Sequence, residues 1–194
     1  MNGLSVGILD ALSFESHLGI PLKKNLHYFD KDLLIAELIS MTEWLDEQEI
    51  LSGIALDYRV KSLDSILLKY DRYYPDHQTR KVFNDILGFR AFCDSYDQIL
   101  EEESVQFRIA DMSSGKAVDD GYRGVHVYYQ KSGKYYPIEI QFNTLFDRQL
   151  NNWLHDYLYK KDYPIETGRI LREKYESGLI RNEHEFKEVL NNVL

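Results

Sequence analysis

The chain has 194 residues, a length that one globular domain with a sizeable core accommodates. Hydrophobic residues make up 44% of it and charged residues 28%, with only 11 Gly and 4 Pro, which excludes a disordered, collagen-like or low-complexity protein. The formal net charge of −9 argues against broad, nonspecific binding to nucleic acid. A small, local basic site is still compatible with that charge.

The sequence also argues against a membrane protein and against a protein stabilised by disulfides or a thiolate zinc site. No apolar run approaches the roughly 20 residues that a transmembrane helix needs, and no basic segment precedes a hydrophobic stretch near the N-terminus. The single cysteine, Cys93, excludes an internal disulfide and a zinc site made of thiolates. We therefore expect a cytoplasmic protein without a membrane-spanning segment.

The first half of the chain alternates between helix and strand patterns. Apolar residues at helical spacing predict a helix over 31–50, capped by Asp30 or Asp32. The residues that carry this spacing are Leu34, Leu38, Met41 and Leu45. The elements expected after it are a strand over 55–59, a helix over 62–74, a strand over 86–93, a helix over 95–103 and a strand over 105–109.

A β-hairpin is expected next, because apolar and polar residues alternate over 125–129 and 138–143. If Ser132-Gly133 forms a two-residue turn, residues whose numbers sum to 265 face each other, so His126 lies opposite Glu139. Helices over 145–160 and 166–194, separated by Pro164, complete the chain. Strands interleaved with helices predict an α/β (α+β) fold in which helices cover a mixed β-sheet.

Three cations and a hydroxyl recur along one side of the helix expected at 62–74. They lie at i, i+4, i+8 and i+11, and they are Lys61, Ser65, Lys69 and Arg72. With Arg59 on the preceding strand, this stripe suits a chain of phosphates, because Arg and Lys both stabilise anionic oxygens. The alternative is a solvated helix face on which Asp64 pairs with Lys61.

Two carboxylates, Asp85 and Glu139, fall at one end of strands that are expected to be adjacent. Such a pair can hold Mg²⁺, which prefers a few carboxylates together with phosphate oxygens. Gly88 would let a ligand approach this strand closely. The alternative is that Glu139 and Gln141 face solvent on the wet side of an antiparallel sheet.

An aromatic residue, Tyr122, lies beside a glycine-flanked bend at 121–124. Its ring could stack on a base, although an ordinary core role is the alternative in a chain with 15 tyrosines. The sequence contains neither a GxxxxGK[ST] loop nor a GxGxxG fingerprint.

Taken in order, these motifs resemble the RelA/SpoT-type nucleotide pyrophosphokinase domain over residues 50–160. The matches are RxKxxxSxxxK at Arg59, Lys61, Ser65 and Lys69, D-x-x-G-x-R at Asp85, Gly88 and Arg90, GYRSxH at Gly121, Tyr122, Arg123 and His126, EIQxRT at Glu139 and Gln141, and W…H at Trp153 and His155.

The resemblance implies a nucleotidyltransferase-like mixed sheet with N- and C-terminal helical extensions. It also implies transfer of the β,γ-pyrophosphate of ATP to a ribose 3′-hydroxyl, which mostly needs positioning and charge neutralisation. Asp85 and Glu139 would be the catalytic residues that hold Mg²⁺, and Glu139 would also help to deprotonate the attacking hydroxyl. The expected ATP ligands are Arg59, Lys61, Ser65, Lys69 and Arg72, and the expected acceptor ligands are Tyr122, His126, Gln141 and Asn143.

The acceptor side departs from the family pattern. Gly124 replaces the serine of GYRS, Asn143 replaces the arginine of EIQxRT, and the PKxNGY approach reads AVDDGY at 117–122. Fewer cations and two added carboxylates should weaken capture of a free guanosine polyphosphate. The pattern resembles the toxic small alarmone synthetases, which pyrophosphorylate the 3′-terminal adenosine of tRNA and so block translation. Lys23, Lys24 and Arg123 would then contact the tRNA, with a solvated loop as the alternative for the lysine pair.

The resulting hypothesis is an ATP- and Mg²⁺-dependent tRNA 3′-end pyrophosphokinase that acts as a toxin restrained by an antitoxin protein. The first alternative is a GTP/GDP pyrophosphokinase that makes (p)ppGpp as a homo-oligomer through its C-terminal helices. The second is a catalytically silent nucleotide-sensing module. We expect one synthetase domain over 1–194, with a helical extension at 1–50, a catalytic core at 51–160 and C-terminal helices at 161–194.

Overall fold

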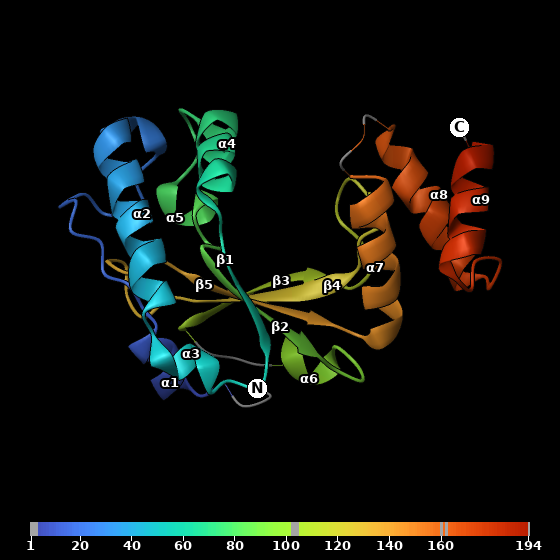
Figure 1. Ribbon diagram of the computed structural model, residues 1–194, viewed down its shortest axis with the longest axis horizontal. Coiled ribbons are helices and arrows are strands. Elements are labelled where there is room, and N and C mark those ends of the chain that lie inside the picture. The colour runs from blue at the N-terminus through green and yellow to red at the C-terminus, as the bar shows by residue number, and fades with distance from the viewer. Residues whose placement is uncertain (1–3, 102–104, 160, 162, 194) are drawn as a thin grey trace. The chain divides into compact units, whose positions relative to one another are not determined.

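The computed structural model describes residues 4–101, 105–159, 161 and 163–193 (Figure 1). Within them the chain packs as two compact units. The first unit contains residues 4–91, 105–109 and 127–141, and the second contains 92–101, 110–126 and 142–193. The organisation as one synthetase domain stays a prediction.

The strands form one mixed sheet, in the order β1–β2–β5–β4–β3. Their bounds are β1 Asp57–Val60, β2 Leu87–Phe92, β3 Phe107–Met112, β4 Gly124–Tyr129 and β5 Ile138–Asn143. β1 pairs with β2 in antiparallel register, with Arg59 opposite Gly88. This sheet and the helices that flank it confirm the predicted fold class.

The helices of the first unit include a long amphipathic one, α2, in the predicted place. Their bounds are α1 Val6–Ala11, η1 Leu26–Tyr28, α2 Lys31–Asp46, α3 Glu49–Ser52, α4 Leu63–Tyr73 and α5 Thr79–Val82. Of the two expected caps, Asp30 accepts a bond from the Leu33 N–H at 3.0 Å. The predicted helix over 31–50 is wrong in its last turn, because α2 ends at Asp46 and α3 is separate. α2 contacts α4 and β1.

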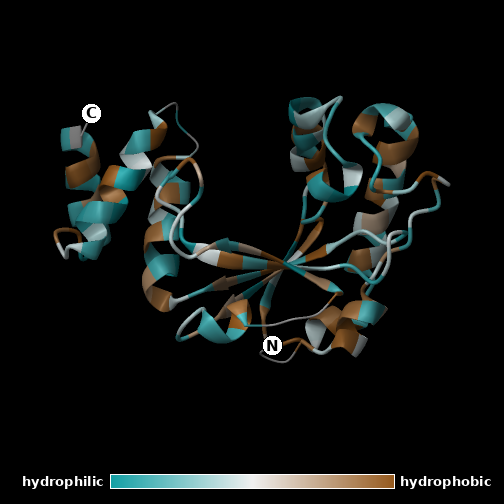
Figure 2. Ribbon diagram, turned by 180° about the vertical axis from the view of Figure 1, so that it is seen from behind, coloured by the Kyte–Doolittle hydropathy of each residue, from teal (hydrophilic) through white to brown (hydrophobic). Residues whose placement is uncertain are grey.

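The second unit is built around the three longer of its four described helices. Its helices are α6 Asp97–Leu100, α7 Leu145–Tyr157, α8 Ile165–Glu176 and α9 Glu183–Val193. Leu154 of α7, Leu171 of α8 and Phe186 of α9 pack in one core, and each of these helices carries hydrophobic and hydrophilic residues (Figure 2). The single helix expected at 166–194 breaks after α8, where Gly178 has a positive φ of 75°. The expected helix ends at 102–103, 160 and 194 lie outside the described residues.

The hairpin strands β4 and β5 are neighbours as predicted, but the two-residue turn is wrong. β4 ends at Tyr129 and β5 begins at Ile138. The connection between them bonds instead to the segment after α1, since the Tyr136 N–H donates to the Phe14 carbonyl and the Ser16 N–H donates to the Lys134 carbonyl. The opposition of His126 and Glu139, which depended on that turn, stays a prediction.

A buried carboxylate, Glu37 of α2, fixes this N-terminal segment. Its Oε1 accepts a bond from the Tyr136 hydroxyl at 2.8 Å, and its Oε2 accepts from the His17 N–H at 2.6 Å. Burial, and then the Glu37 carboxylate, raise the pKa of Tyr136. Both carboxylate oxygens are therefore satisfied, as a buried charge requires.

In the described part of the chain, no helix is both long and apolar enough to cross a membrane.

Candidate active site

Three cations of the predicted donor motif converge on Asp85, immediately before β2. Lys61 Nζ lies 2.7 Å from Asp85 Oδ2, and Lys69 Nζ lies 2.9 Å from Oδ1. The Arg59 guanidinium approaches Oδ2 at 3.8 Å. These contacts contradict the alternative in which Lys61 pairs with Asp64 across a solvated helix face. The first unit therefore holds a cationic cradle, formed by Arg59, Lys61 and Lys69 around one carboxylate.

Lys61 lies in the connection between β1 and α4, not on a helix, and its side chain contacts Asp85 from there. It precedes Ser62, the N-cap of α4, and its N–H donates to the Ile86 carbonyl at 2.8 Å. The predicted helical position of Lys61 is therefore wrong, although its side chain still joins Lys69. The Lys61 side chain is only 8% exposed. Burial lowers the pKa of its ammonium, and the Asp85 carboxylate opposes this shift.

The other two predicted ATP ligands lie on α4. Ser65 Oγ is 2.9 Å from Ser62 Oγ, and Arg72 is exposed in the last helical turn. Among the described side chains, Arg72 makes no ion pair with Asp85. The roles of both residues stay predictions.

The second carboxylate, Glu139 on β5, is 4% exposed and is bonded by its neighbours. Gln141 Nε2 donates to Glu139 Oε2 at 2.7 Å, and the Tyr128 hydroxyl also bonds to Glu139. Gly88 lies beside this oxygen, since a Cβ at Gly88 would be 3.6 Å from Glu139 Oε2. Glu139 is therefore oriented by Tyr128 and Gln141.

Asp85 and Glu139 offer carboxylate oxygens, which are the kind of ligand that a magnesium ion prefers. Burial, and then the Glu139 and Asp85 carboxylates, raise the pKa of Tyr128, so both lie near one phenol. Within the described residues, no group of three or more His, Cys, Asp and Glu side chains could hold a metal. Mg²⁺ keeps several waters and shares substrate phosphates, so a pair of carboxylates suffices for it. Asp85 and Glu139 are the residues that would hold it.

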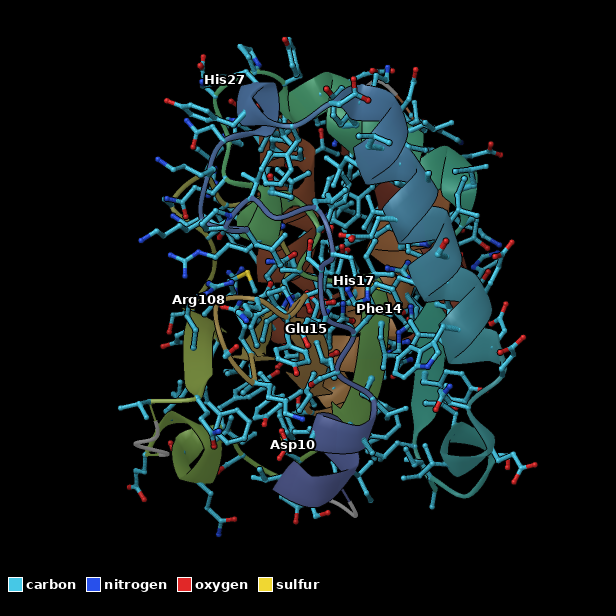
Figure 3. All side chains as sticks on the ribbon, turned by 90° about the vertical axis from the view of Figure 1, so that its left-hand side faces the viewer. Asp10, Phe14, Glu15, His17, His27 and Arg108 are labelled. Carbon is cyan, nitrogen blue, oxygen red and sulfur yellow. The ribbon has the colours of Figure 1, made fainter. Side chains whose placement is uncertain are left out.

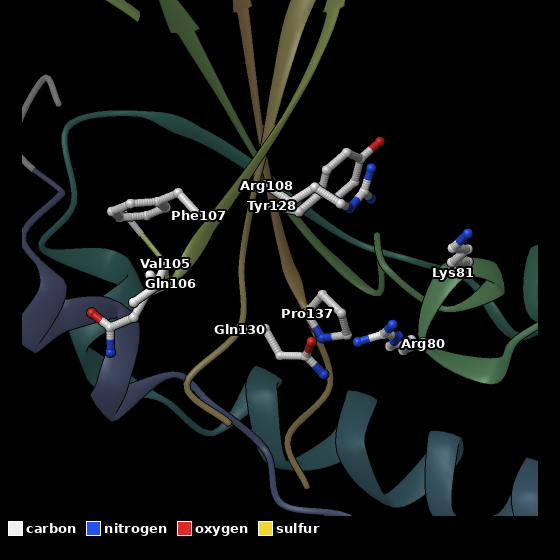
Figure 4. A pocket seen from close by; sticks show the side chains of 9 residues that line it. All are labelled: Arg80, Lys81, Val105, Gln106, Phe107, Arg108, Tyr128, Gln130 and Pro137. Atoms are coloured by element: carbon white, nitrogen blue, oxygen red, sulfur yellow. The ribbon is translucent and has the colours of Figure 1, made fainter. Parts of the chain in front are cut away.

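Sequence reasoning missed Arg108 on β3 and Tyr128 on β4. The Arg108 guanidinium lies 4.0 Å from the centroid of the Tyr128 ring, a cation–π contact. A cavity of about 200 Å³ opens beside this pair, and Arg80 and Lys81 of α5 also line it (Figure 4). The strand alternation places Tyr128 on the same strand face as His126, a signal that could have found it. No local pattern points to Arg108.

In the second unit, the predicted acceptor residues Tyr122 and His126 lie side by side. The Tyr122 hydroxyl is 2.7 Å from His126 Nε2, and the two rings meet edge to face at 5.6 Å. Lys116 Nζ lies 5.0 Å from the centroid of the Tyr122 ring. The tyrosine ring is thus held by its hydroxyl and contacted by a cation, and its stacking on an acceptor base stays a prediction.

The two carboxylates that distinguish this loop from the family pattern each hold a cation. Asp119 binds the Arg123 guanidinium through both oxygens, at 2.8 and 2.9 Å. The bond from Arg123 lowers the pKa of Asp119 and raises the pKa of the guanidinium. Asp120 binds Lys116 Nζ at 2.5 Å. The positive charges of this loop are therefore neutralised within the loop itself.

Asn143 and Gly124, which also differ from the family motifs, lie against each other. The Asn143 amide is 2% exposed, and its Nδ2 donates to the Arg123 carbonyl at 3.0 Å. A Cβ at Gly124 would lie 2.6 Å from this Nδ2 and 2.8 Å from the Tyr122 hydroxyl, so a glycine leaves room for both. Asn143 therefore supports the loop backbone, and its contact with an acceptor stays a prediction, as does that of Gln141.

A buried arginine of α8 anchors the same loop. Arg172 is fully buried, and its Nε donates to the Gly121 carbonyl at 2.8 Å. Its other nitrogens bind Asp147 at 2.7 Å and Asn151 at 3.0 Å. Gly168 of α8 packs directly on the loop, where a Cβ would lie 1.9 Å from the Asp120 carbonyl oxygen. The conformation of the Tyr122 loop thus depends on α8.

The basic pair Lys23 and Lys24 lies in the first unit, and both side chains are exposed. Lys24 Nζ is 5.1 Å from the centroid of the Tyr28 ring. The Lys24 carbonyl accepts bonds from the Thr79 N–H and hydroxyl, at 3.0 and 3.2 Å. Contact of Lys23, Lys24 and Arg123 with tRNA stays a prediction.

A model of the region found in RelA/SpoT proteins matches residues 58–163, more than half of the chain. The chain belongs to the RelA/SpoT family. The match contains every residue of the cationic cradle, both carboxylates and the Tyr122 loop. As a member of the RelA/SpoT family, the protein is a nucleotide pyrophosphokinase. The comparison with curated proteins found no match.

Several solved structures are similar to this RelA/SpoT chain. Small alarmone synthetase 1 from Bacillus subtilis, bound to its product pppGpp, is 25% identical, with 83% of this chain and 89% of that chain covered and a TM-score of 0.45. Small alarmone synthetase 2 from Bacillus subtilis is 22% identical, with 84% and 97% covered and a TM-score of 0.46. A GTP pyrophosphokinase family protein from Streptococcus pneumoniae is 24% identical, with 82% and 89% covered and a TM-score of 0.42.

Proposed function

We propose that this pyrophosphokinase transfers the β,γ-pyrophosphate of ATP to the 3′-hydroxyl of the tRNA terminal adenosine, with cleavage of the bond between the α- and β-phosphates and release of AMP. The cationic cradle supports the donor half of the proposal. Lys61 and Lys69 are already oriented toward one anion, and the burial of Lys61 strengthens its attraction to an incoming phosphate. Arg59 adds a planar guanidinium at the edge of the cradle, while Ser65 and Arg72 extend it along α4.

The carboxylates supply the remaining chemistry. Asp85 and Glu139 would hold Mg²⁺, which when bound neutralises charge on the transferred phosphates. Glu139 accepts the proton of the attacking 3′-hydroxyl, and the bonds from Gln141 and Tyr128 keep its carboxylate in a fixed orientation. The ring of Tyr122 stacks on the acceptor base, with His126 positioning the phenol.

The choice of tRNA as acceptor rests on the paired charges of the Tyr122 loop. A free GDP or GTP carries a 5′-polyphosphate that needs unpaired cations close to the base-stacking residue. Here Arg123 is bonded to Asp119 and Lys116 to Asp120. The terminal adenosine of tRNA has no polyphosphate, so it is accepted without breaking these pairs. This pairing is the observation that carries the proposal.

The RNA would be held through a few phosphates. Lys23 and Lys24 are exposed and supply the main cationic contact, whereas Arg123 must first leave Asp119 to contribute. A blocked 3′-hydroxyl cannot be aminoacylated, so we expect the enzyme to act as a translation-inhibiting toxin restrained by an antitoxin protein.

One observation favours a second candidate, synthesis of (p)ppGpp from GTP or GDP. Lys116 lies beside the Tyr122 ring, where its ammonium would reach a nucleotide phosphate if Asp120 released it. The C-terminal helices would then serve homo-oligomer formation.

An acceptor assay separates the candidates. The protein is incubated with γ-labelled ATP, Mg²⁺ and either deacylated tRNA or a mixture of GDP and GTP. We expect the label to enter tRNA. Label in guanosine nucleotides alone contradicts the tRNA acceptor and supports the second candidate. ATP binding without any labelled product identifies a silent nucleotide sensor.

A charge variant tests the reason for this selectivity. The double substitution Asp119→Asn and Asp120→Asn frees Arg123 and Lys116, so labelling of GDP relative to tRNA should rise about tenfold. The matched control, Asp94→Asn with Asp111→Asn, removes two exposed carboxylates of the same unit and should leave the ratio unchanged. An equal ratio in both double variants would show that the paired charges do not select the acceptor.

A further inference from the structure

A second cationic cavity lies in the first unit, apart from the donor cradle. Its volume is about 510 Å³, and none of the cradle residues or the two carboxylates lines it. Its charged and apolar walls come from Glu15, Ile20, Pro21, Lys23, Arg80 and Lys134. Small-molecule sites typically measure about 300–1,000 Å³, so the cavity is large enough for a nucleotide.

Hydrogen bonds hold the walls of this cavity in place. The Ser16 N–H donates to the Lys134 carbonyl at 2.8 Å, and the His17 N–H donates to the buried Glu37 carboxylate at 2.6 Å. Figure 3 shows Glu15 and His17 on the segment that continues from α1 toward η1. The Arg80 N–H donates to the Leu22 carbonyl at 2.9 Å. The cavity is therefore built from segments that bond to one another and to α2.

The charge of the cavity selects an anion. Lys23, Arg80 and Lys134 face a single carboxylate, Glu15, whose Oε1 is 3.8 Å from Lys134 Nζ. In a chain with a net charge of −9, this excess of positive charge is local. Ile20 and Pro21 add an apolar wall. We infer that this cavity is a second nucleotide site, with the phosphates on the cations and the base against the apolar wall.

A hydrogen-bonded path connects the cavity to Asp85. Leu22 and Lys24, on either side of Lys23, accept bonds from the backbone of Arg80 and Thr79 in α5. At the other end of α5, the Val82 carbonyl accepts a bond from Lys69 Nζ at 3.2 Å. The same ammonium binds Asp85. A nucleotide that draws Lys23 and Arg80 together therefore acts on α5, which helps to hold Lys69 in the cradle.

Arg80 provides a second connection, because it also lines the cavity beside Arg108 and Tyr128 (Figure 4). Its Nε donates to the Gln78 side chain at 3.2 Å, so the guanidinium has a defined position between the two cavities. A phosphate bound in the larger cavity and a ligand in the smaller one compete for this guanidinium.

Calorimetric titration of the full chain with AMPCPP, a nonhydrolysable ATP analogue, tests the site. The wild type should bind a second, weaker molecule of AMPCPP in addition to the one in the donor cradle. Lys134→Glu should weaken the second site about tenfold and leave the first unchanged. The matched control is Lys131→Glu, on the same β4–β5 connection but outside the cavity, and it should keep both sites.

Either of two results in the AMPCPP titration overturns the inference. One is a single AMPCPP per wild-type chain, and the other is an equal second site in the Lys134→Glu and Lys131→Glu variants. The titration is repeated with an oligonucleotide ending in CCA to distinguish RNA phosphates from a free nucleotide. A loss confined to the oligonucleotide makes the cavity an RNA contact and overturns the nucleotide site. Neither titration needs turnover, so failure here leaves the proposed transfer reaction untouched.

Hydrogen exchange tests the path through α5. The amides of Thr79 and Arg80 bond to Lys24 and Leu22, so AMPCPP at concentrations that fill the second site should slow their exchange several-fold. Lys134→Glu should abolish this protection, whereas Lys131→Glu should retain it. Unchanged exchange of both amides in the wild type would contradict the coupling.

Discussion

Glu139→Gln is expected to lower the rate of pyrophosphate transfer by at least about a thousandfold. The amide cannot take up the proton of the 3′-hydroxyl, and it removes one of the two negative charges available to Mg²⁺. Its shape is preserved, and its oxygen can still accept a bond from Gln141 or Tyr128. The free energy of unfolding should therefore change by only about 1 kcal/mol. Single-turnover labelling and urea denaturation measure the two effects.

Glu37→Gln is the matched control for this substitution. Glu37 is also buried, at 9% exposed, and also accepts two hydrogen bonds, but its partners, His17 and Tyr136, are not among the residues proposed to bind ATP, Mg²⁺ or the acceptor. The Glu37 variant should lose about 1–2 kcal/mol of unfolding free energy and transfer pyrophosphate at the wild-type rate. A Glu139→Gln enzyme that keeps more than about a tenth of the wild-type rate would remove Glu139 from the chemistry.

Arg172→Leu is expected to reduce the free energy of unfolding by about 3–5 kcal/mol. The guanidinium is fully buried, and burial lowers its pKa despite the neighbouring Asp147. Leucine would leave the Asp147 carboxylate without its cation and the Gly121 carbonyl without its donor. Because Gly121 precedes Tyr122, acceptor binding should weaken as well. Guanidinium chloride denaturation gives the first effect, and the acceptor KM gives the second.

Arg169→Leu, on the same helix, controls for the loss of an arginine. Arg169 is exposed and its partner is Glu173, one turn away on the surface. Exposed pairs of this kind contribute about 0.3–0.5 kcal/mol, so this variant should denature close to the wild type. If the two leucine variants differ by less than about 1 kcal/mol, Arg172 does not anchor the Tyr122 loop as described.

The residues that meet around Asp85 could be named from the sequence, although their role in binding ATP stays a prediction. Lys61, Lys69 and Asp85 were all identified, because the family motifs that contain them are local properties of the sequence. The spacing could not show that Lys61 lies before the helix or that its partner is Asp85 rather than Asp64. That choice depends on β1 pairing with β2, which brings distant parts of the chain together.

On the acceptor side, the sequence identified the unusual residues of the Tyr122 loop but not the contacts that they make. The sequence showed the extra carboxylates Asp119 and Asp120, and the structure shows that they neutralise Arg123 and Lys116. The two-residue hairpin turn failed because the segment after α1 bonds to the β4–β5 connection, a competition that no local propensity contains. Arg108 escaped notice because its contact with Tyr128 joins two separate strands.

The order of the motifs in the sequence resembles the RelA/SpoT family and indicates alternating helices and strands, a donor motif and a pair of carboxylates. These features follow from residue type and short-range spacing, which are present before folding. Only the packed chain decides which cation meets which carboxylate, where cavities open, and how α8 supports the Tyr122 loop. Each of those contacts joins residues far apart in sequence, and burial gives them an energy that spacing alone does not reveal.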